Sequence, residues 1–308
     1  TGNTVTGGQP VVNLDKGLLY NSLIYGNTGS TIVKLGDNGY MLNCTVVSES
    51  GTAISGSHVK KSIDGSEDEP LFAPYLNTTN SYELPEYLSD YQPYWYQLHE
   101  NSLQIDPEDE TTGLPNELAS YVNYDSDRDV LGNPRRIGSK VDNGCFETWK
   151  ATSAQPLTAT SNPSRYGGHF YPHAGSVVYI MEDATLTIPA TLDGEDNLVA
   201  EFPASNPIQP GYLLVKKGGS LLAKGNYVNA SYVSAEKAFD SGTQYALAAM
   251  PFPVNHVTED VAMKTYSGSD RAAFNYQFTT ANSPCWKEQT SIDAACEGWM
   301  MIRIHTDE

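Results

Sequence analysis

The chain has 308 residues, an apolar content of 39% and a net charge of −19, from 37 acidic and 18 basic residues. This length allows one large or two ordinary hydrophobic cores, and we expect two. The negative charge disfavours a nucleic acid partner, because the protein's own field would repel phosphates. No segment approaches the roughly 18 consecutive apolar residues of a membrane helix, and no signal peptide is visible, so a transmembrane segment is not expected.

The first 56 residues contain a repeat with a period near 22 residues. Asn21 and Gly29 in one stretch correspond to Asn43 and Gly51 in the next, and residues 2–4 echo residues 26–28. Apolar and polar residues alternate within each repeat, which is the period of a β-strand. Short strands repeated at this interval are typical of a β-solenoid. The asparagines are expected at corners, where their amides can stack from one turn of the solenoid to the next.

A long acidic and tyrosine-rich region follows the repeats. Between Ser62 and Asp127 there are 15 Asp or Glu residues and no Lys or Arg. Solvated surface loops explain this composition, and binding of a divalent cation or a cationic partner is the functional alternative. Within the region, residues 116–124 have the spacing of a short helix.

Eight aromatic residues fall between positions 72 and 96 of the same region. Exposed aromatic rings are the surfaces on which sugars stack, so Tyr91, Tyr94 and Trp95 are candidate ligand-binding residues. The structural alternative is that these rings cap the open end of the solenoid, where strand edges would otherwise be exposed.

The segment from Asp127 to Glu147 carries a recognisable order of motifs. It contains an Asp-rich turn, then Gly132-Asn133-Pro134-Arg135, Val141-Asp142-Asn143-Gly144 and the pair Phe146-Glu147. This order resembles the closing segment of right-handed parallel β-helix proteins of the pectate-lyase-like superfamily, as found in surface and secreted proteins of gut and environmental bacteria. The resemblance covers roughly residues 1–150 and implies the last few turns of a capped parallel β-helix. Such endings occur both in enzymes and in proteins without known activity.

The same segment begins with oxygen-bearing side chains at alternate positions, as in a calcium loop. Asp125, Asp127 and Asp129 are therefore candidate metal ligands, and calcium is the candidate cofactor. The calcium-loop pattern then fails, because Val130 stands where glycine is expected and Arg136 where glutamate is expected. We therefore favour a structural role for these aspartates, with no metal site and no cofactor.

The remainder of the chain is expected to form a second β-rich unit. A Ser, Thr and Pro-rich linker is expected at 151–165, followed at 166–308 by either a sandwich or an irregular solenoid. Residues 175–188 and 211–222 resemble each other as pairs of short strands. Cys285 and Cys296 flank a polar loop and are candidates for a disulfide in an oxidising compartment.

These observations favour an all-β, non-catalytic protein of the bacterial cell surface or extracellular space. It would be a structural stalk or an adhesin-like module that binds carbohydrate or a surface protein, and we expect a monomer. The chain begins within a repeat and stops in a strand-like run, so we expect a piece of a longer protein. The alternative function is a polysaccharide-degrading enzyme, a glycoside hydrolase or lyase, for which Asp106 and Glu108 are the candidate catalytic acids.

Overall fold

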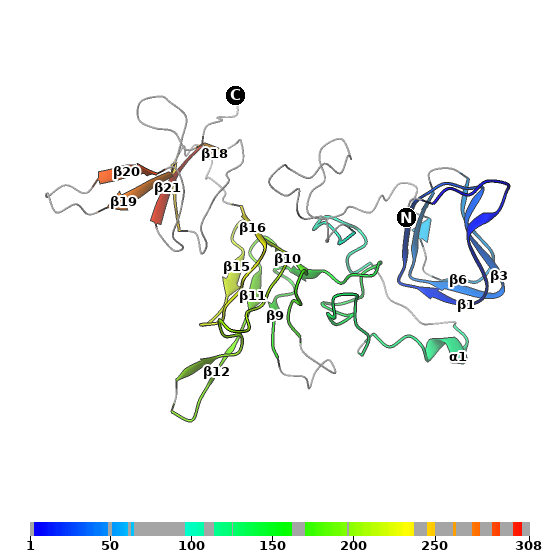
Figure 1. Cartoon of the computed structure of the whole chain (residues 1–308), viewed down its shortest axis with the longest axis horizontal. Coiled ribbons are helices and arrows are strands. Elements are labelled where there is room, and N and C mark those ends of the chain that lie inside the picture. Colours follow the sequence, from blue (N-terminus) through cyan, green and yellow to red (C-terminus); the bar gives the residue numbers. More distant parts are fainter. Residues whose placement is uncertain are drawn as a thin grey trace. The chain divides into compact units, whose positions relative to one another are not determined.

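The structure, a computed structural model, describes residues 3–48, 51–60, 63–64, 96–107, 114–124, 126–161, 170–195 and 197–236, together with five strands beyond them. Contacts divide the chain into two compact units, Thr1–Glu236 and Lys237–Glu308. Apart from the four-residue helix α1 (Asn116–Ala119), the regular elements of the described part are strands (Figure 1). The expected all-β class is therefore confirmed, and no described helix is long and apolar enough to cross a membrane.

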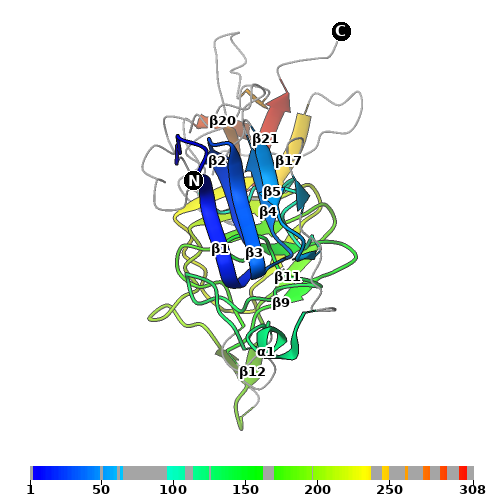
Figure 2. The ribbon, with the colours of Figure 1, turned by 90° about the vertical axis from the view of Figure 1, so that its right-hand side faces the viewer.

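The first unit begins with two parallel sheets, and the chain alternates between them. Strands β1 (Pro10–Tyr20), β3 (Thr31–Leu42), β5 (Thr52–Ser55) and β6 (Val59–Lys60) form one sheet, and strands β2 (Leu23–Asn27), β4 (Thr45–Ser48) and β7 (Ile63–Asp64) form the other. Figure 2 shows β1, β3 and β5 side by side. Each pass of the chain thus adds one strand to each sheet, as the repeat predicts.

The register between strands reproduces the sequence repeat. Tyr20 pairs with Leu42 and Leu23 pairs with Thr45, each 22 positions apart. The first sheet also has an irregularity between Leu14 and Lys16, where the offset changes by one. Apolar side chains that alternate along these strands meet between the sheets, because successive residues of a strand point to opposite faces. The buried members of this core are Ile32, Val33, Leu35, Met41, Cys44, Val46 and Ala53.

Asparagines lie at the corners between successive strands, as expected, but their amides do not all stack directly on one another. At the first corner the backbone N–H and the side-chain amide of Asn3 both donate to Oδ1 of Asn27, each at 3.0 Å. At the second corner Asn21 and Asn43 have φ of 43° and 49°, a left-handed conformation that Asn tolerates. There the Tyr124 hydroxyl joins the two amides, since it accepts from Asn43 and donates to Asn21. The ladder thus includes a tyrosine from 81 residues further along.

A second set of parallel strands follows in the same unit. Strands β8 (Trp149–Ala151), β10 (Val177–Ile180), β14 (Tyr212–Val215) and β16 (Tyr232–Ala235) form one sheet, and strands β9 (Leu157–Thr158), β11 (Thr185–Thr187) and β15 (Ser220–Leu222) form another. Val177 pairs with Tyr212 and Thr185 with Ser220, which matches the similarity of the two sequence segments. The second core forms around these strands and includes Trp149, Ile180, Leu186, Ile188 and Phe202.

Close backbone contact between passes requires glycine at one turn. A Cβ atom on Gly211 would lie 2.8 Å from the carbonyl oxygen of Gly175, a separation that side chains do not adopt. The N–H of Gly211 also donates to the carbonyl of Ser176. The paired glycines that precede β10 and β14 therefore let consecutive passes approach.

The segment expected to be a linker is partly folded into this second set of strands. Strand β9 lies within it and pairs with β11, and Leu157 and Ala159 are buried. The expected boundaries at 150 and 165 thus fall inside the first unit, because alternating apolar positions in a Ser, Thr and Pro-rich stretch still supply one short strand. Of the expected helix at 116–124, only α1 forms.

Two further β elements complete the described chain. Strands β12 (Ala190–Leu192) and β13 (Leu198–Ala200) form a separate antiparallel hairpin in the first unit. The second unit contains an antiparallel sheet in the order β17-β21-β19-β20, with β18 also paired to β21. Its strands are β17 (Tyr245–Ala249), β18 (Val261–Ala262), β19 (Ala273–Gln277), β20 (Cys285–Gln289) and β21 (Gly298–Arg303).

Candidate functional site

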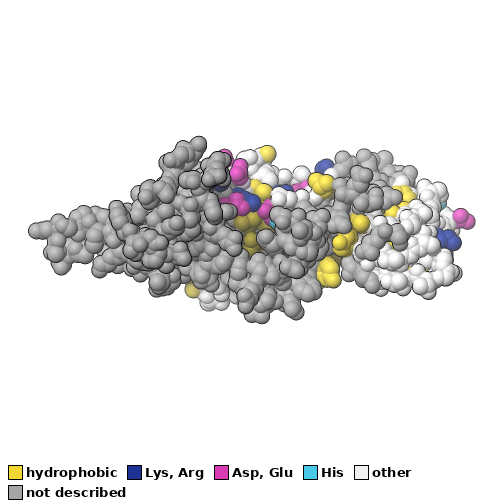
Figure 3. Space-filling view, turned by 90° about the horizontal axis from the view of Figure 1, so that it is seen from above, with side chains coloured by type: hydrophobic (Ala, Val, Ile, Leu, Met, Phe, Trp, Pro, Cys, Tyr) yellow, Lys and Arg dark blue, Asp and Glu magenta, His cyan; other side chains and the backbone are white. Residues whose placement is uncertain are grey.

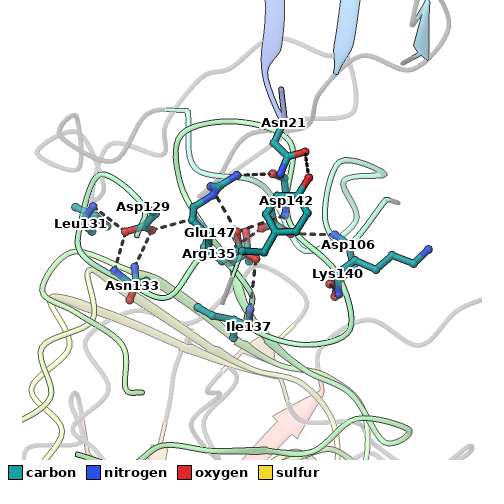
Figure 4. Close-up of polar contacts among 12 residues, drawn as sticks. Asn21, Asp106, Asp129, Leu131, Asn133, Arg135, Ile137, Lys140, Asp142 and Glu147 are labelled. Atoms are coloured by element: carbon teal, nitrogen blue, oxygen red, sulfur yellow. Dashed lines mark hydrogen bonds and ion pairs between the residues drawn. The ribbon is translucent and has the colours of Figure 1, made fainter. Parts of the chain in front are cut away.

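Residues 127–147, here called the closing segment, hold six of the buried polar or charged side chains of the described residues. In Figure 4, Asp129 lies to one side of Arg135, Asp142 and Glu147, and is bonded to Leu131 and Asn133. Its Oδ1 accepts from the backbone N–H groups of Leu131 and Asn133, both at 2.8 Å. Its Oδ2 accepts from the Asn133 side chain and from the Glu147 backbone N–H, both at 2.9 Å. Four donors therefore occupy the acceptor positions of this carboxylate.

Asn133 extends this network into the second set of strands. Its Oδ1 accepts from the indole N–H of Trp149 at 3.0 Å and from the backbone N–H of His173 at 3.0 Å. The Ser176 hydroxyl lies 2.9 Å from its Nδ2. Trp149 is in turn part of the second core. The Gly-Asn-Pro-Arg motif thus connects the closing segment to the start of the second set of strands.

Asp142 and Glu147 form a buried carboxylate pair beside Arg135. Asp142 accepts from the backbone N–H groups of Asp106 at 2.9 Å and Thr148 at 2.7 Å. Arg135 donates from Nη2 to the carbonyl of Asp142 at 2.9 Å, and its Nη1 lies 3.4 Å from Oε2 of Glu147. Figure 4 shows these side chains gathered around one point. The hydrogen bond from Asp106 connects this group to a residue 36 positions earlier in the chain.

Burial dominates the ionisation of this pair. It raises the pKa of Asp142 to about 7, against the lowering effect of the hydrogen bonds from Thr148 and Asp106. Burial, followed by the nearby charge of Asp142, also raises the pKa of Glu147 well above its usual range. The pair therefore holds protons more tightly than exposed carboxyls do. Raised pKa values of this kind occur at catalytic acids and in buried structural networks.

A second ionic group connects the segment 96–107 to the end of β14. Glu100 lies 3.0 Å from Nζ of Lys216 and 2.9 Å from Nε2 of His99. Burial by itself would raise the pKa of Glu100, but hydrogen bonds and charges from His99 and Lys216 lower it to about 2. On the face drawn in Figure 3, acidic and basic side chains of the described residues lie next to each other beside hydrophobic side chains.

A pocket of about 540 Å³ lies where the Asn21 corner meets the closing segment. One side is formed by residues 20–23 and the other by residues 128–130, Arg135, Gly144 and Cys145, with Tyr96 at its edge. The N–H of Gly144 donates to the carbonyl of Asn21 at 2.9 Å, which joins the two sides. Asp106, Asp142 and Glu147 are not among the residues that line this pocket.

Only some of the candidate site residues predicted from the sequence have side chains that the structure describes. Asp106 is half-buried next to Asp142, with its Oδ1 accepting from the backbone N–H of Lys140 at 2.8 Å. The described residues contain no group of three or more His, Cys, Asp or Glu side chains that could hold a metal ion. Of the candidate metal ligands, Asp129 is occupied by N–H donors and Asp127 accepts through its backbone carbonyl from Arg135. The other candidates lie outside the residues whose side chains the structure describes: Tyr91, Tyr94, Trp95, Glu108, Asp125, Cys285 and Cys296.

Sequence reasoning did not find the partners that matter most in this region. Tyr124, Gln97 and Asn21 are joined to distant residues, and sequence spacing carries no signal for such contacts. Gln97 accepts from the N–H of Val177 and donates to the carbonyl of Gly175, both at 2.9 Å. The presence of Asn133, Arg135 and Glu147 in one motif was visible, but their burial was not.

Comparison with known proteins gave no match: no protein family, no curated protein and no solved structure is similar to this chain at a significant level.

Proposed function

We propose that this chain is a non-catalytic module of an exported bacterial surface protein, and that it binds carbohydrate or another surface. In this proposal the stacked parallel strands belong to a right-handed parallel β-helix of the pectate-lyase-like kind, ended by the closing segment. The parallel pairing at a 22-residue offset supports the solenoid part of the proposal.

One observation carries the functional part of the proposal. The carboxylate of Asp129, the most prominent acid of the recognisable motif, accepts from four N–H donors and is buried. A carboxylate used in this way holds a chain segment in place and has no free lone pair for a proton transfer or a metal ion. The motif is therefore best explained as structural, and binding is the function left to the surfaces around it.

Polysaccharide hydrolysis is the second candidate because two carboxyls, Asp106 and Asp142, are neighbours and the pKa of Asp142 is raised. Asp142 has a pKa raised to about 7, and Asp106 lies beside it with its backbone N–H bonded to Asp142. Glycosidases use a pair of carboxyls in which the pKa of one, the general acid, is raised. Full burial of Asp142 argues against this function, since a substrate would have to reach it.

A panel of neutral and acidic polysaccharides distinguishes the two functions. Retention and released oligosaccharide would be measured with the whole chain, with and without calcium. The variant Asp106→Asn keeps the left-handed backbone and removes the charge, and Glu182→Gln changes an exposed acid as its control. We expect retention of at least one polysaccharide without product in all three proteins. Product that is lost only in Asp106→Asn would establish an enzyme, and absence of any retention would leave a stalk or protein-binding module.

A further inference from the structure

The pocket between the Asn21 corner and the closing segment is lined by three side chains with N–H donors, Asn21, Arg128 and Arg135, and by the hydroxyl groups of Tyr20, Ser22 and Tyr96. Its one carboxylate, Asp129, already accepts from four donors. The Ser22 hydroxyl donates to the carbonyl of Tyr20 at 2.9 Å. The carboxylate of the lining is therefore already occupied, whereas the N–H groups of Asn21 and the two arginines suit a ligand oxygen that accepts hydrogen bonds.

Asn21 supplies a donor that lacks a partner within the described part of the chain. Its side chain is 4% exposed, and its Nδ2 is buried without a hydrogen bond. The Tyr124 hydroxyl accepts from Asn43 and donates to Oδ1 of Asn21, which leaves Nδ2 as the remaining group of the amide. A buried N–H without an acceptor costs free energy, and a ligand oxygen in the pocket would recover it.

The charge of the pocket lining is positive, although the whole chain carries −19. Arg128 and Arg135 contribute two positive charges, and Asp129 contributes one negative charge. Glu147 lies beside Arg135 outside the lining, and burial favours its protonated, neutral form. Guanidinium groups are the side chains that best recognise negatively charged oxygens. The aromatic rings of Tyr20 and Tyr96 also belong to the lining.

We propose that this pocket binds an oxyanion, a carboxylate, sulfate or phosphate group carried by a sugar. Acceptor-only oxygens match a lining that offers donors and net positive charge, and the tyrosine rings provide a surface for the sugar. The inference rests on the proposed function and narrows it from carbohydrate in general to acidic carbohydrate. It places recognition in the described pocket and gives a role to the buried amide of Asn21.

Calorimetric titration of the whole chain tests the proposal with four monosaccharides: glucose, glucuronic acid, glucose 6-sulfate and glucose 6-phosphate. Titrations up to about 10 mM at low salt suit the millimolar affinity expected of one charged group. We expect at least one charged sugar to bind and glucose not to bind. The charged sugar that binds most tightly identifies the source of the oxyanion. Equal binding of glucose, or no binding of any charged sugar, would overturn the proposal.

Two matched variants show whether binding occurs in this pocket. Asn21→Asp keeps the acceptor for Tyr124 and tolerates the left-handed backbone, but it replaces the free donor with a negative charge. We expect the affinity for the charged sugar to fall about tenfold or more. Asn206→Asp introduces the same negative charge at an exposed position outside the pocket, and should leave the affinity within about twofold. Equal losses in both variants, or no loss in Asn21→Asp, would contradict the proposal.

A third variant keeps the test decisive if Asn21→Asp does not fold. Arg128→Gln removes one positive charge from the lining, and the circular dichroism spectrum would establish its folding. We expect the same loss of affinity for the charged sugar. The polysaccharide panel tests the proposed function independently. If the chain retains a neutral polysaccharide but binds no charged sugar, the oxyanion proposal is overturned and the proposed function is still supported.

Discussion

Single residues of the closing segment have roles that depend on their burial more than on their chemical type. Asp129 and Asp142 are both acids of the same segment, and both accept from backbone N–H groups. For Asp142, burial outweighs these bonds and raises the pKa to about 7. A carboxyl held in this way makes the stability of the fold depend on pH.

Asp142 is predicted to destabilise the folded chain as the pH rises. Its pKa is about 7 when folded against 3.8 for the unfolded chain, so the folded state binds the proton more tightly. Its contribution to stability is complete below about pH 4 and is lost as the pH rises to about 7. The loss is on the order of a few kcal/mol. In Asp142→Asn the free energy of unfolding in urea should change less between pH 4 and pH 7. An identical pH dependence in wild type and variant would contradict the assignment.

The hydroxyl group of Tyr124 is predicted to stabilise the folded chain. Tyr124→Phe removes the oxygen that joins Asn43 to Asn21, so two buried amides lose a partner. We expect a loss of about 1–3 kcal/mol in the free energy of unfolding. Tyr121→Phe is the control, because Tyr121 is 71% exposed and should change stability by less than about 0.5 kcal/mol. Equal effects of the two substitutions would rule out the bridge.

The sequence predicts the residue types of this network but not their partners. A calcium ligand and a carboxylate that binds backbone N–H groups use the same oxygens, so alternating aspartates suggest both. The structure places Asp129 in the second role. The contact of Tyr124 with the Asn21 corner spans 103 positions, and no local pattern encodes it. Asn21 was expected to stack directly on Asn43, a contact that the larger tyrosine takes over.

At the scale of elements, the central strand of the second set is predicted to carry much of the packing energy. Strand β10 lies between β8 and β14, and Ile180 within it is fully buried. Ile180→Ala should lower the free energy of unfolding by about 2–5 kcal/mol, as removal of a buried aliphatic side chain does. Leu192→Ala in the β12–β13 hairpin is the control, because Leu192 is 60% exposed and should have almost no effect. A small effect of Ile180→Ala would contradict the packing described for β10.

Strands were predictable from the sequence wherever a repeat was visible. The pairs 175–188 and 211–222 become β10, β11, β14 and β15 in matching register. Strand β9 was missed because Ser, Thr and Pro dominate its surroundings, and only Leu157 and Ala159 indicate burial. Local composition is thus a weaker guide than the pairing that a neighbouring strand imposes.

At the scale of the whole molecule, the first unit is predicted to fold without the second. Contacts separate residues 1–236 from residues 237–308, and each unit has its own sheets. A protein of residues 1–236 should therefore give a β-type circular dichroism spectrum and one cooperative unfolding transition in urea. Loss of cooperativity in this shortened chain would show that the second unit is needed.

The division of the chain into folded units was only partly predictable from the sequence. A repeat reveals that consecutive passes pair, so the all-β class and the first sheets followed from the sequence. The expected boundary near residue 150 relied on the end of a recognisable motif. In the structure Asn133 accepts from the backbone N–H of His173 across this position, and β8 pairs with β10 on the other side. The end of the motif is therefore not the end of the folded unit, because the packing of strands beyond residue 150 depends on residues outside the motif.

The most direct test of the central claim, that the acids of the closing segment hold the fold together, is the unfolding free energy of Asp129→Ala. The substitution removes the acceptor of two buried backbone N–H groups, those of Asn133 and Glu147, and of the half-buried N–H of Leu131. It also removes one of the two partners of the Asn133 amide. We predict a loss of about 3 kcal/mol or more in urea unfolding relative to the wild type. Unchanged stability, within about 0.5 kcal/mol, would contradict the account and indicate a carboxylate kept for chemistry or binding.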